Sequence, residues 1–217
     1  MPYPKRRHTE VLREVVQPFG GTIADIGCGR GALVGWFEKH GFHALGIDPQ
    51  AVLHPTLAAC AERLPLADSS LDHVLFFNSL HHVPVDAMAG ALAEAARVVR
   101  HDGRVIVVEP LAEGRHFEMM QPVDDETEIR AAARAAIAVA AGGCLRQQAE
   151  LFYDTTLVQQ SPEEVLAEFL EVDPGRAGLI ERARAEVVRR FGELGEPVDK
   201  GVAFNQPMRL NLLLPRP

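Results

Sequence analysis

The residues best suited to chemistry lie near the N-terminus, in the stretch Ile23-Ala24-Asp25-Ile26-Gly27-Cys28-Gly29-Arg30-Gly31. An apolar segment runs into a glycine-rich turn here, and glycine lets a ligand approach the backbone closely. Gly27, Gly29 and Ala32 also satisfy the relaxed dinucleotide fingerprint G-x-G-x-x-A, and a tight turn without a ligand is a further interpretation. Asp25 separates these interpretations, because a carboxylate at the mouth of the turn would repel a pyrophosphate and suit a cationic ligand.

A second acidic residue, Asp48, lies 21 residues beyond Gly27 and ends the next predicted strand. This spacing is about right for an acid that binds a ribose. A simple cap on the strand end is the structural alternative.

Two adjacent histidines form the next candidate group, in the segment Asn78-Ser79-Leu80-His81-His82. An imidazole titrates near neutrality, so either His81 or His82 is a candidate general base. The alternative is that both cap the next helix or pack beneath it. Glu109 ends a later strand and points at the same crevice, so we count it as a third catalytic candidate.

The elements that must position these residues alternate between strand and helix. Apolar segments predict strands at 22–26, 43–47, 71–77 and 104–109, and helical spacing predicts helices at 9–17, 31–39 and 85–100. Such alternation implies right-handed crossovers and a mostly parallel sheet. Beyond Pro110 we expect an irregular loop or short lid at 111–123, helices at 124–141, 161–171 and 177–190, and strands at 151–158 and 208–214.

Composition narrows the class of protein further. The 217 residues include 22 Lys and Arg against 30 Asp and Glu, and the net charge of −8 disfavours a nucleic-acid partner. No apolar run approaches the roughly 20 residues of a membrane span. Cys28, Cys60 and Cys144 lie far apart, with neither metal-ligand spacing nor an even disulfide set, so we expect no metal site and a cytoplasmic location.

The order of the motifs resembles class I S-adenosylmethionine-dependent methyltransferases. The pattern D-x-G-x-G-x-G, followed by an acid that ends the next strand, is similar to the family's first motif. Three later segments resemble its DAExLPFxDxSFD, xxLHHxxD and RVLKPGGR motifs, and these are 61–72, 78–84 and 97–104. Together the motifs cover 22–109, about 40% of the chain, and the core is similar to the branch that contains quinone-biosynthesis methyltransferases.

The resemblance implies roles for particular residues. Asp25 and the loop would hold the methionine portion of S-adenosylmethionine, and Asp48, followed by Pro49, would accept hydrogen bonds from both ribose hydroxyls. Ala61 and Glu62 would lie along the adenine edge, and Asn78 would face the transferable methyl group. The implied loop residues are Gly27, Cys28, Gly29 and Gly31.

Two positions depart from the family pattern. Cys60 stands where the family usually has Asp or Asn, and a thiol is a poor acceptor for the adenine amine. Backbone atoms would then recognise the adenine, unless the motif is shifted by one residue. Asp102 stands in a turn where Pro or Gly is common.

The resemblance implies a Rossmann-like, doubly wound α/β fold with a mostly parallel seven-stranded sheet, a final antiparallel strand and helical additions after strand five. We predict one domain, with a cofactor-binding core at 22–109 and substrate-side parts at 1–20 and 110–203. The predicted activity is in-line methyl transfer to a small-molecule acceptor, with S-adenosylhomocysteine as product. The alternatives are a cofactor-binding protein with a protein or regulatory partner, and an NAD(P)-binding oxidoreductase. The oxidoreductase lacks support because the chain has no Tyr-x-x-x-Lys constellation.

Overall fold

A computed structural model of the chain describes residues 3–17, 19–172 and 174–216. It divides into two compact units. The first, here called the sheet unit, comprises His8–Pro110, Ile129–Leu151 and Arg209–Pro217. The second, the helical unit, comprises Met1–Arg7, Leu111–Glu128 and Phe152–Met208.

The strands form one mostly parallel sheet with one antiparallel strand, in the order β3-β2-β1-β4-β5-β8-β6. The sheet unit holds β1 (Gly21–Ile26), β2 (Phe42–Asp48), β3 (Leu57–Ala58), β4 (Leu71–Phe77) and β5 (Val99–Pro110). Two longer strands, β6 (Leu145–Gln159) and β8 (Gly201–Pro215), contribute residues to both units. The strands expected at 22–26, 43–47, 71–77 and 104–109 are confirmed, whereas β3 was not predicted because it is only two residues long.

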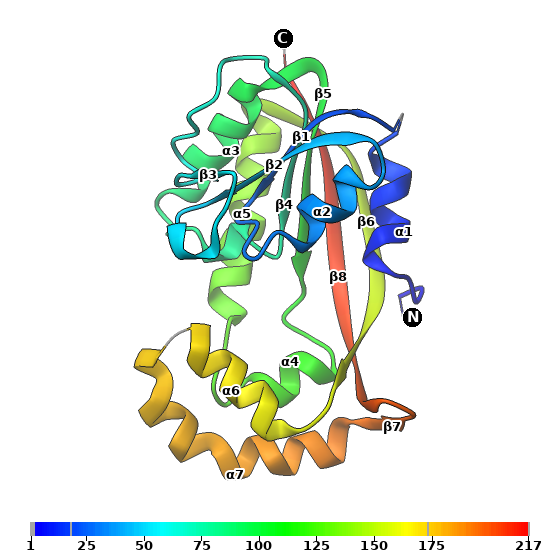
Figure 1. Cartoon of the computed structure of the whole chain (residues 1–217), viewed down its shortest axis with the longest axis vertical. Helices are drawn as coiled ribbons and strands as arrows, with labels where there is room; N and C mark the ends of the chain where they lie inside the picture. The colour runs from blue at the N-terminus through cyan, green and yellow to red at the C-terminus, as the bar shows by residue number, and fades with distance from the viewer. Residues whose placement is uncertain (1–2, 18, 173, 217) are drawn as a thin grey trace. The chain divides into compact units, whose positions relative to one another are not determined.

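Helices cover both faces of the sheet, as the doubly wound prediction requires. They are α1 (His8–Val15), α2 (Ala32–Glu38), α3 (Met88–Val98) and α5 (Thr127–Gly142), with short 3-10 turns η1 (Ala51–Leu53) and η2 (Leu80–His82). Figure 1 shows α3 and α5 on one face and α1 and α2 on the other. Val105 and Val107 of β5 pack in one core cluster with α3 and α5 residues, and Ile106 and Val108 are also fully buried. Burial on both faces explains why this strand reads as a continuous apolar run.

The helical unit contains α4 (Arg115–Met120), α6 (Pro162–Val172), η3 (Pro174–Arg176), α7 (Ala177–Leu194) and β7 (Glu196–Val198). The helix α4 lies in the segment that we expected to be an irregular loop. It forms because Phe117, Met119 and Met120 are buried, the two methionines in a cluster with Val187 and Phe191 of α7. The antiparallel hairpin of β7 with β8 was also not predicted.

Among the described residues, no helix combines the length and the apolar character needed to cross a bilayer.

Candidate functional site

The candidate residues gather because neighbouring parallel strands end together. In the sheet, Ile26 of β1 lies beside Ile47 of β2 and Phe76 of β4, and Phe77 of β4 lies beside Val108 of β5. The order of the strands reverses between β1 and β4, and open α/β sheets bind ligands outside the carboxyl ends of their strands at such a point. The strand ends that carry Asp25, Asp48, Asn78 and Glu109 therefore share one edge of the sheet unit.

Asp25 is a buried carboxylate that lacks a full set of partners. The residue is only 3% exposed, and its Oδ1 has no hydrogen-bond partner among the described residues. Burial, and then the neighbouring charge of Asp48, raise the pKa of Asp25 to about 7. An unpaired buried carboxylate is costly, so this position calls for a cationic ligand.

Asp48 supports the glycine-rich turn directly. Its Oδ2 accepts the N–H of Gly29 at 3.0 Å, and its Oδ1 accepts the N–H of Gln50 at 2.8 Å. The strand-end cap that we considered as an alternative is thus present. Each carboxylate oxygen has a second lone-pair site, so the same group retains acceptor capacity for ribose hydroxyls.

The glycines of the turn serve two different purposes. Gly27 has φ +73°, and a Cβ at this position would meet the Ser79 Cβ at 2.5 Å. Ser79 in turn donates its hydroxyl to the Ile26 carbonyl at 2.6 Å, so Gly27 is required by packing within the protein. A Cβ on Gly29 would meet nothing within 4 Å, which leaves the open space that a ligand against the backbone requires.

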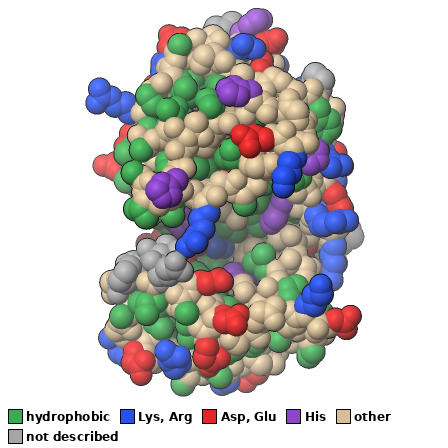
Figure 2. All heavy atoms as spheres, in the orientation of Figure 1, with side chains coloured by type: hydrophobic (Ala, Val, Ile, Leu, Met, Phe, Trp, Pro, Cys, Tyr) green, Lys and Arg blue, Asp and Glu red, His purple; other side chains and the backbone are tan. Residues whose placement is uncertain are grey.

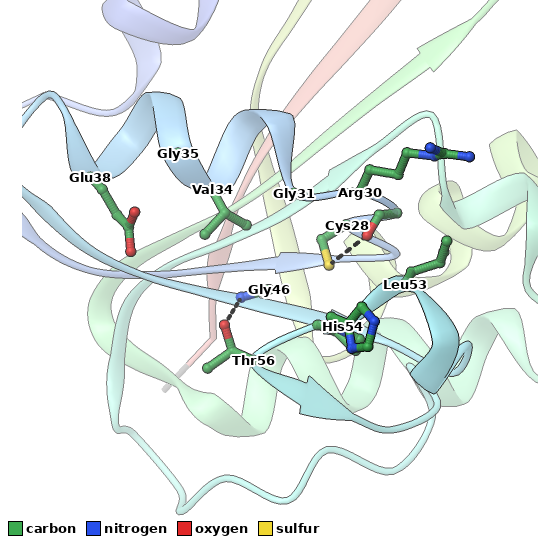
Figure 3. Close-up of a pocket in the computed structure, with 12 residues that line it drawn as sticks. Cys28, Arg30, Gly31, Val34, Gly35, Glu38, Gly46, Leu53, His54 and Thr56 are labelled. Carbon is green, nitrogen blue, oxygen red and sulfur yellow. Dashed lines mark hydrogen bonds between the residues drawn. The ribbon is translucent and has the colours of Figure 1, made fainter.

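The Cys28 thiol lies at a hollow of about 210 Å³ beside the turn, whose lining also includes Gly29, Gly31 and Gly46. Figure 3 shows the Cys28 sulfur on the side of Gly46. A Cβ on Gly46 would lie only 2.8 Å from this sulfur. Burial raises the pKa of Cys28 to about 11, so the thiol stays protonated at neutral pH. Cys28 therefore offers the turn its backbone, and its side chain serves as packing.

The predicted adenine residues follow β3, which pairs with the end of β2. Ala61 is buried in the main core cluster, so only its backbone can serve a ligand. Glu62 is exposed, and its Cβ lies 3.5 Å from where a Cβ on Gly90 of α3 would stand. Cys60 and Pro49 are exposed.

The three catalytic candidates separate into a buried pair and one exposed histidine. Glu109 accepts the Leu80 N–H through Oε1 at 3.0 Å and interacts with His81 Nδ1 through Oε2, and both side chains are almost fully buried. The exposed His82 ring packs against His81 with centroids 4.0 Å apart. Asn78 is exposed, with φ +51°, and its N–H donates to the Val108 carbonyl.

Sequence analysis missed the function of Arg97, which begins the fourth motif. Its guanidinium donates to the carbonyls of Leu64 and Leu66 at 3.1 and 2.8 Å, and also to Asp68 and Glu94. Glu94 accepts the Leu64 N–H at 2.9 Å. The second and fourth motifs are therefore joined by hydrogen bonds that fix the loop before β4. The spacing of Glu94 and Arg97, three residues apart on a predicted helix, is the signal that the sequence offers.

Fold and site together define a doubly wound α/β protein that gathers Asp25, Asp48 and Glu109 at the strand ends of the sheet unit. The family model described as methyltransferase domain matches residues 24–107, a range that includes Asp25, Asp48 and His81. Residues 24–107 are therefore similar to a methyltransferase domain. No curated protein matches the sequence significantly.

Several solved structures share the fold. A Bacillus halodurans protein provisionally described as a methyltransferase is 14% identical, with a TM-score of 0.62 and coverage of 95% of this chain and 97% of its own. YcgJ of Bacillus subtilis is 16% identical, with a TM-score of 0.58 and coverage of 96% and 97%. A SAM-dependent methyltransferase of Thermotoga maritima is 15% identical, with a TM-score of 0.55 and coverage of 94% and 86%. At these identities the likeness concerns the fold, and the quinone-biosynthesis branch stays a prediction.

Proposed function

We propose that the chain transfers the methyl group of S-adenosylmethionine to a small-molecule acceptor and releases S-adenosylhomocysteine. The observation that carries this proposal is the buried, incompletely paired Asp25 carboxylate beside Asp48 at the switch point of the sheet. Two carboxylates here would repel the pyrophosphate of a dinucleotide, which argues against the oxidoreductase alternative. They would attract a ligand that carries an ammonium group.

The residues that would hold the cofactor fit its parts. Asp25 would pair with the ammonium of the methionine portion, and the remaining lone-pair sites of Asp48 would accept the ribose hydroxyls. Gly29 leaves room for the ligand against the turn, and the Ala61 backbone would meet the adenine edge. When bound, the cofactor supplies a sulfonium-activated methyl group, which an acceptor displaces in line. Positioning then accounts for much of the catalysis.

An acceptor hydroxyl or amine must also lose a proton. The Glu109 carboxylate takes the Nδ1 side of His81, so a proton held on Nδ1 would leave Nε2 as the atom that receives the acceptor's proton. Glu109 thus acts as the positioning residue and His81 as the general base. His82, exposed and packed at a tilt against His81, would contact the acceptor.

The acceptor is proposed to be a small molecule for electrostatic reasons. The chain has a net charge of −8, and on the face shown in Figure 2 the basic side chains of the described residues are interspersed with acidic ones and histidines. A phosphate backbone would gain little from such a surface. The free thiols of Cys28, Cys60 and Cys144 fit the predicted cytoplasmic location.

Calorimetric titration with S-adenosylhomocysteine tests the proposal. We expect saturable binding at micromolar concentrations, at least about tenfold weaker in Asp48→Ala because hydrogen bonds to the charged carboxylate are lost. Asp102→Ala, which removes an exposed carboxylate from β5 where we expected a turn, is the matched control and should bind as the wild type does. Absence of binding at high micromolar concentration would contradict the proposal, and saturable NADH binding would revive the oxidoreductase.

A further inference from the structure

The sheet unit contains a buried arginine whose two terminal nitrogens have no hydrogen-bond partner among the described residues. Arg209 lies on β8, and its side chain is only 4% exposed. Its Nε donates to the Asn211 side-chain oxygen at 3.0 Å, and the nearest carboxylate, that of Glu150, lies 3.9 Å from Nε. Both Nη atoms still touch solvent-accessible space, because neither belongs to the fully enclosed unpartnered atoms of the described residues.

The hydrogen bonds around Arg209 show which side of the guanidinium is already used. The Asn211 amide donates to Gln147 at 3.3 Å and to Glu150 at 3.2 Å, so these side chains on β8 and β6 form a small polar cluster. The cluster engages only the Nε edge of Arg209. The planar Nη fork, which suits a bidentate carboxylate, is left for another partner.

Arg209 also lies on the side of the sheet that carries the proposed base. On β8, Leu213 points to the same face as Arg209, and it packs in one core cluster with Ala133 and Ile137 of α5. On β5, Val107 points to the same face as Glu109 and belongs to the same cluster. Arg209 and Glu109 therefore face the same layer. Burial and the Arg134 charge on α5 lower the pKa of Arg209, while the charges of Glu150 and Glu109 raise it.

Arg134 thus repels the charge of Arg209, at a position where burial already disfavours a positive charge. Like charges held together in this way favour an anionic ligand, as an acceptor with a carboxylate would be. Arg134 is exposed on α5 and has no ion-pair partner among the described residues, so its charge is available to the same anion.

We propose that Arg209, assisted by Arg134, binds a carboxylate group of the methyl acceptor, so that the acceptor is a small carboxylic acid. This inference rests on the proposed function, since it names the substrate class of that site. The Nη fork would hold the carboxylate, while the nucleophilic atom of the acceptor would lie toward His81 and Glu109.

The test compares benzoate with benzamide, its neutral isostere, by titration into protein saturated with S-adenosylhomocysteine and observed by amide NMR. We expect benzoate to bind at least about tenfold more tightly than benzamide, because its hydrogen bonds are charge-assisted. Arg209→Met should remove this preference. Arg134→Glu, on the exposed face of a helix, should reduce it severalfold without loss of fold. Lys39→Glu, at the C-terminal end of α2, changes the net charge equally and should leave it unchanged.

Equal binding of benzoate and benzamide to the wild type would overturn the inference, as would a preference that survives both arginine substitutions. If inorganic phosphate binds and benzoate does not, the carboxylate assignment is contradicted. Failure of S-adenosylhomocysteine to bind would instead contradict the proposed function, so the two failures are distinguishable.

Discussion

Replacing Asp25 by Asn should make the cofactor-free protein more stable at pH 8 and abolish its cofactor binding. Asp25 is buried with an unpartnered oxygen, and its folded-state pKa is raised from 3.8 to about 7. Between these two values the folded state binds more protons than the unfolded state, so the free energy of unfolding falls as pH rises. Above pH 7 the buried charge is fully present and its cost is greatest.

The size of the effect follows from the pKa shift. About 1.4 kcal/mol per pKa unit gives a total of about 4 kcal/mol across the window, of which about 3 kcal/mol falls between pH 5 and pH 8. The amide introduced by the substitution would itself lack a hydrogen bond, at a cost of about 1–3 kcal/mol that does not vary with pH. Between pH 5 and pH 8, the free energy of unfolding of the variant should therefore rise relative to that of the wild type by about 3 kcal/mol.

Urea unfolding of the cofactor-free protein at pH 5, 6, 7 and 8 measures this difference. Asp102→Asn, which replaces an exposed carboxylate, is the control and should follow the wild type at every pH. Parallel stability profiles for the wild type and Asp25→Asn would refute the reasoning, because Asp25 would then titrate normally. Retention of S-adenosylhomocysteine binding by Asp25→Asn would refute its assignment to the ammonium group.

Three further substitutions test the supporting geometry. Gly27→Ala should cost about 2–4 kcal/mol of unfolding free energy, because the backbone has φ +73° and the new Cβ meets Ser79, and Ser79→Gly should restore part of it; a cost below about 0.5 kcal/mol, well under that range, would contradict the packing argument. Arg97→Met should lower the unfolding free energy by about 1–3 kcal/mol in urea, since two loop carbonyls lose their donor; an unchanged midpoint would show that the loop holds without it. Glu109→Gln should reduce kcat at least about tenfold through the wrong His81 tautomer while cofactor affinity changes less than about twofold; equal losses in both would indicate a purely structural pair.

The strand ends and their acids could be predicted from sequence because they depend on local pattern. Asp25 and Asp48 each close a short apolar run, and parallel strands bring such ends to one edge of a sheet. The boundaries of β1, β2 and β4 accordingly lie within one residue of those expected. The single-domain organisation and the cofactor roles of these residues stay predictions.

Contacts between distant segments could not be predicted. His81 and Glu109 were both candidates, but their pairing joins residues 28 positions apart on different elements. The Gly27 contact with Ser79 has the same character, since a glycine beside a ligand and a glycine beside a neighbouring loop look alike in a sequence.

Arg209 did leave a signal in the sequence. It stands with Asn211 at alternate positions of the otherwise apolar segment 208–214, where one face of a strand should be apolar throughout. Two polar residues on one buried face indicate a polar cluster or a ligand. Only the structure shows that the Nε edge of Arg209 is occupied and that its Nη fork has no partner among the described residues.

The central claim is that Asp25 is held partly protonated for a cationic cofactor, and proton release on binding tests it most directly. Calorimetry with S-adenosylhomocysteine at pH 6.5, repeated in buffers of different ionisation enthalpy, gives the number of protons released. A pKa of about 7 means that about three-quarters of Asp25 is protonated at this pH, so binding to the wild type should release about 0.7 proton. Tight binding of S-adenosylhomocysteine to the wild type without proton release would contradict the claim.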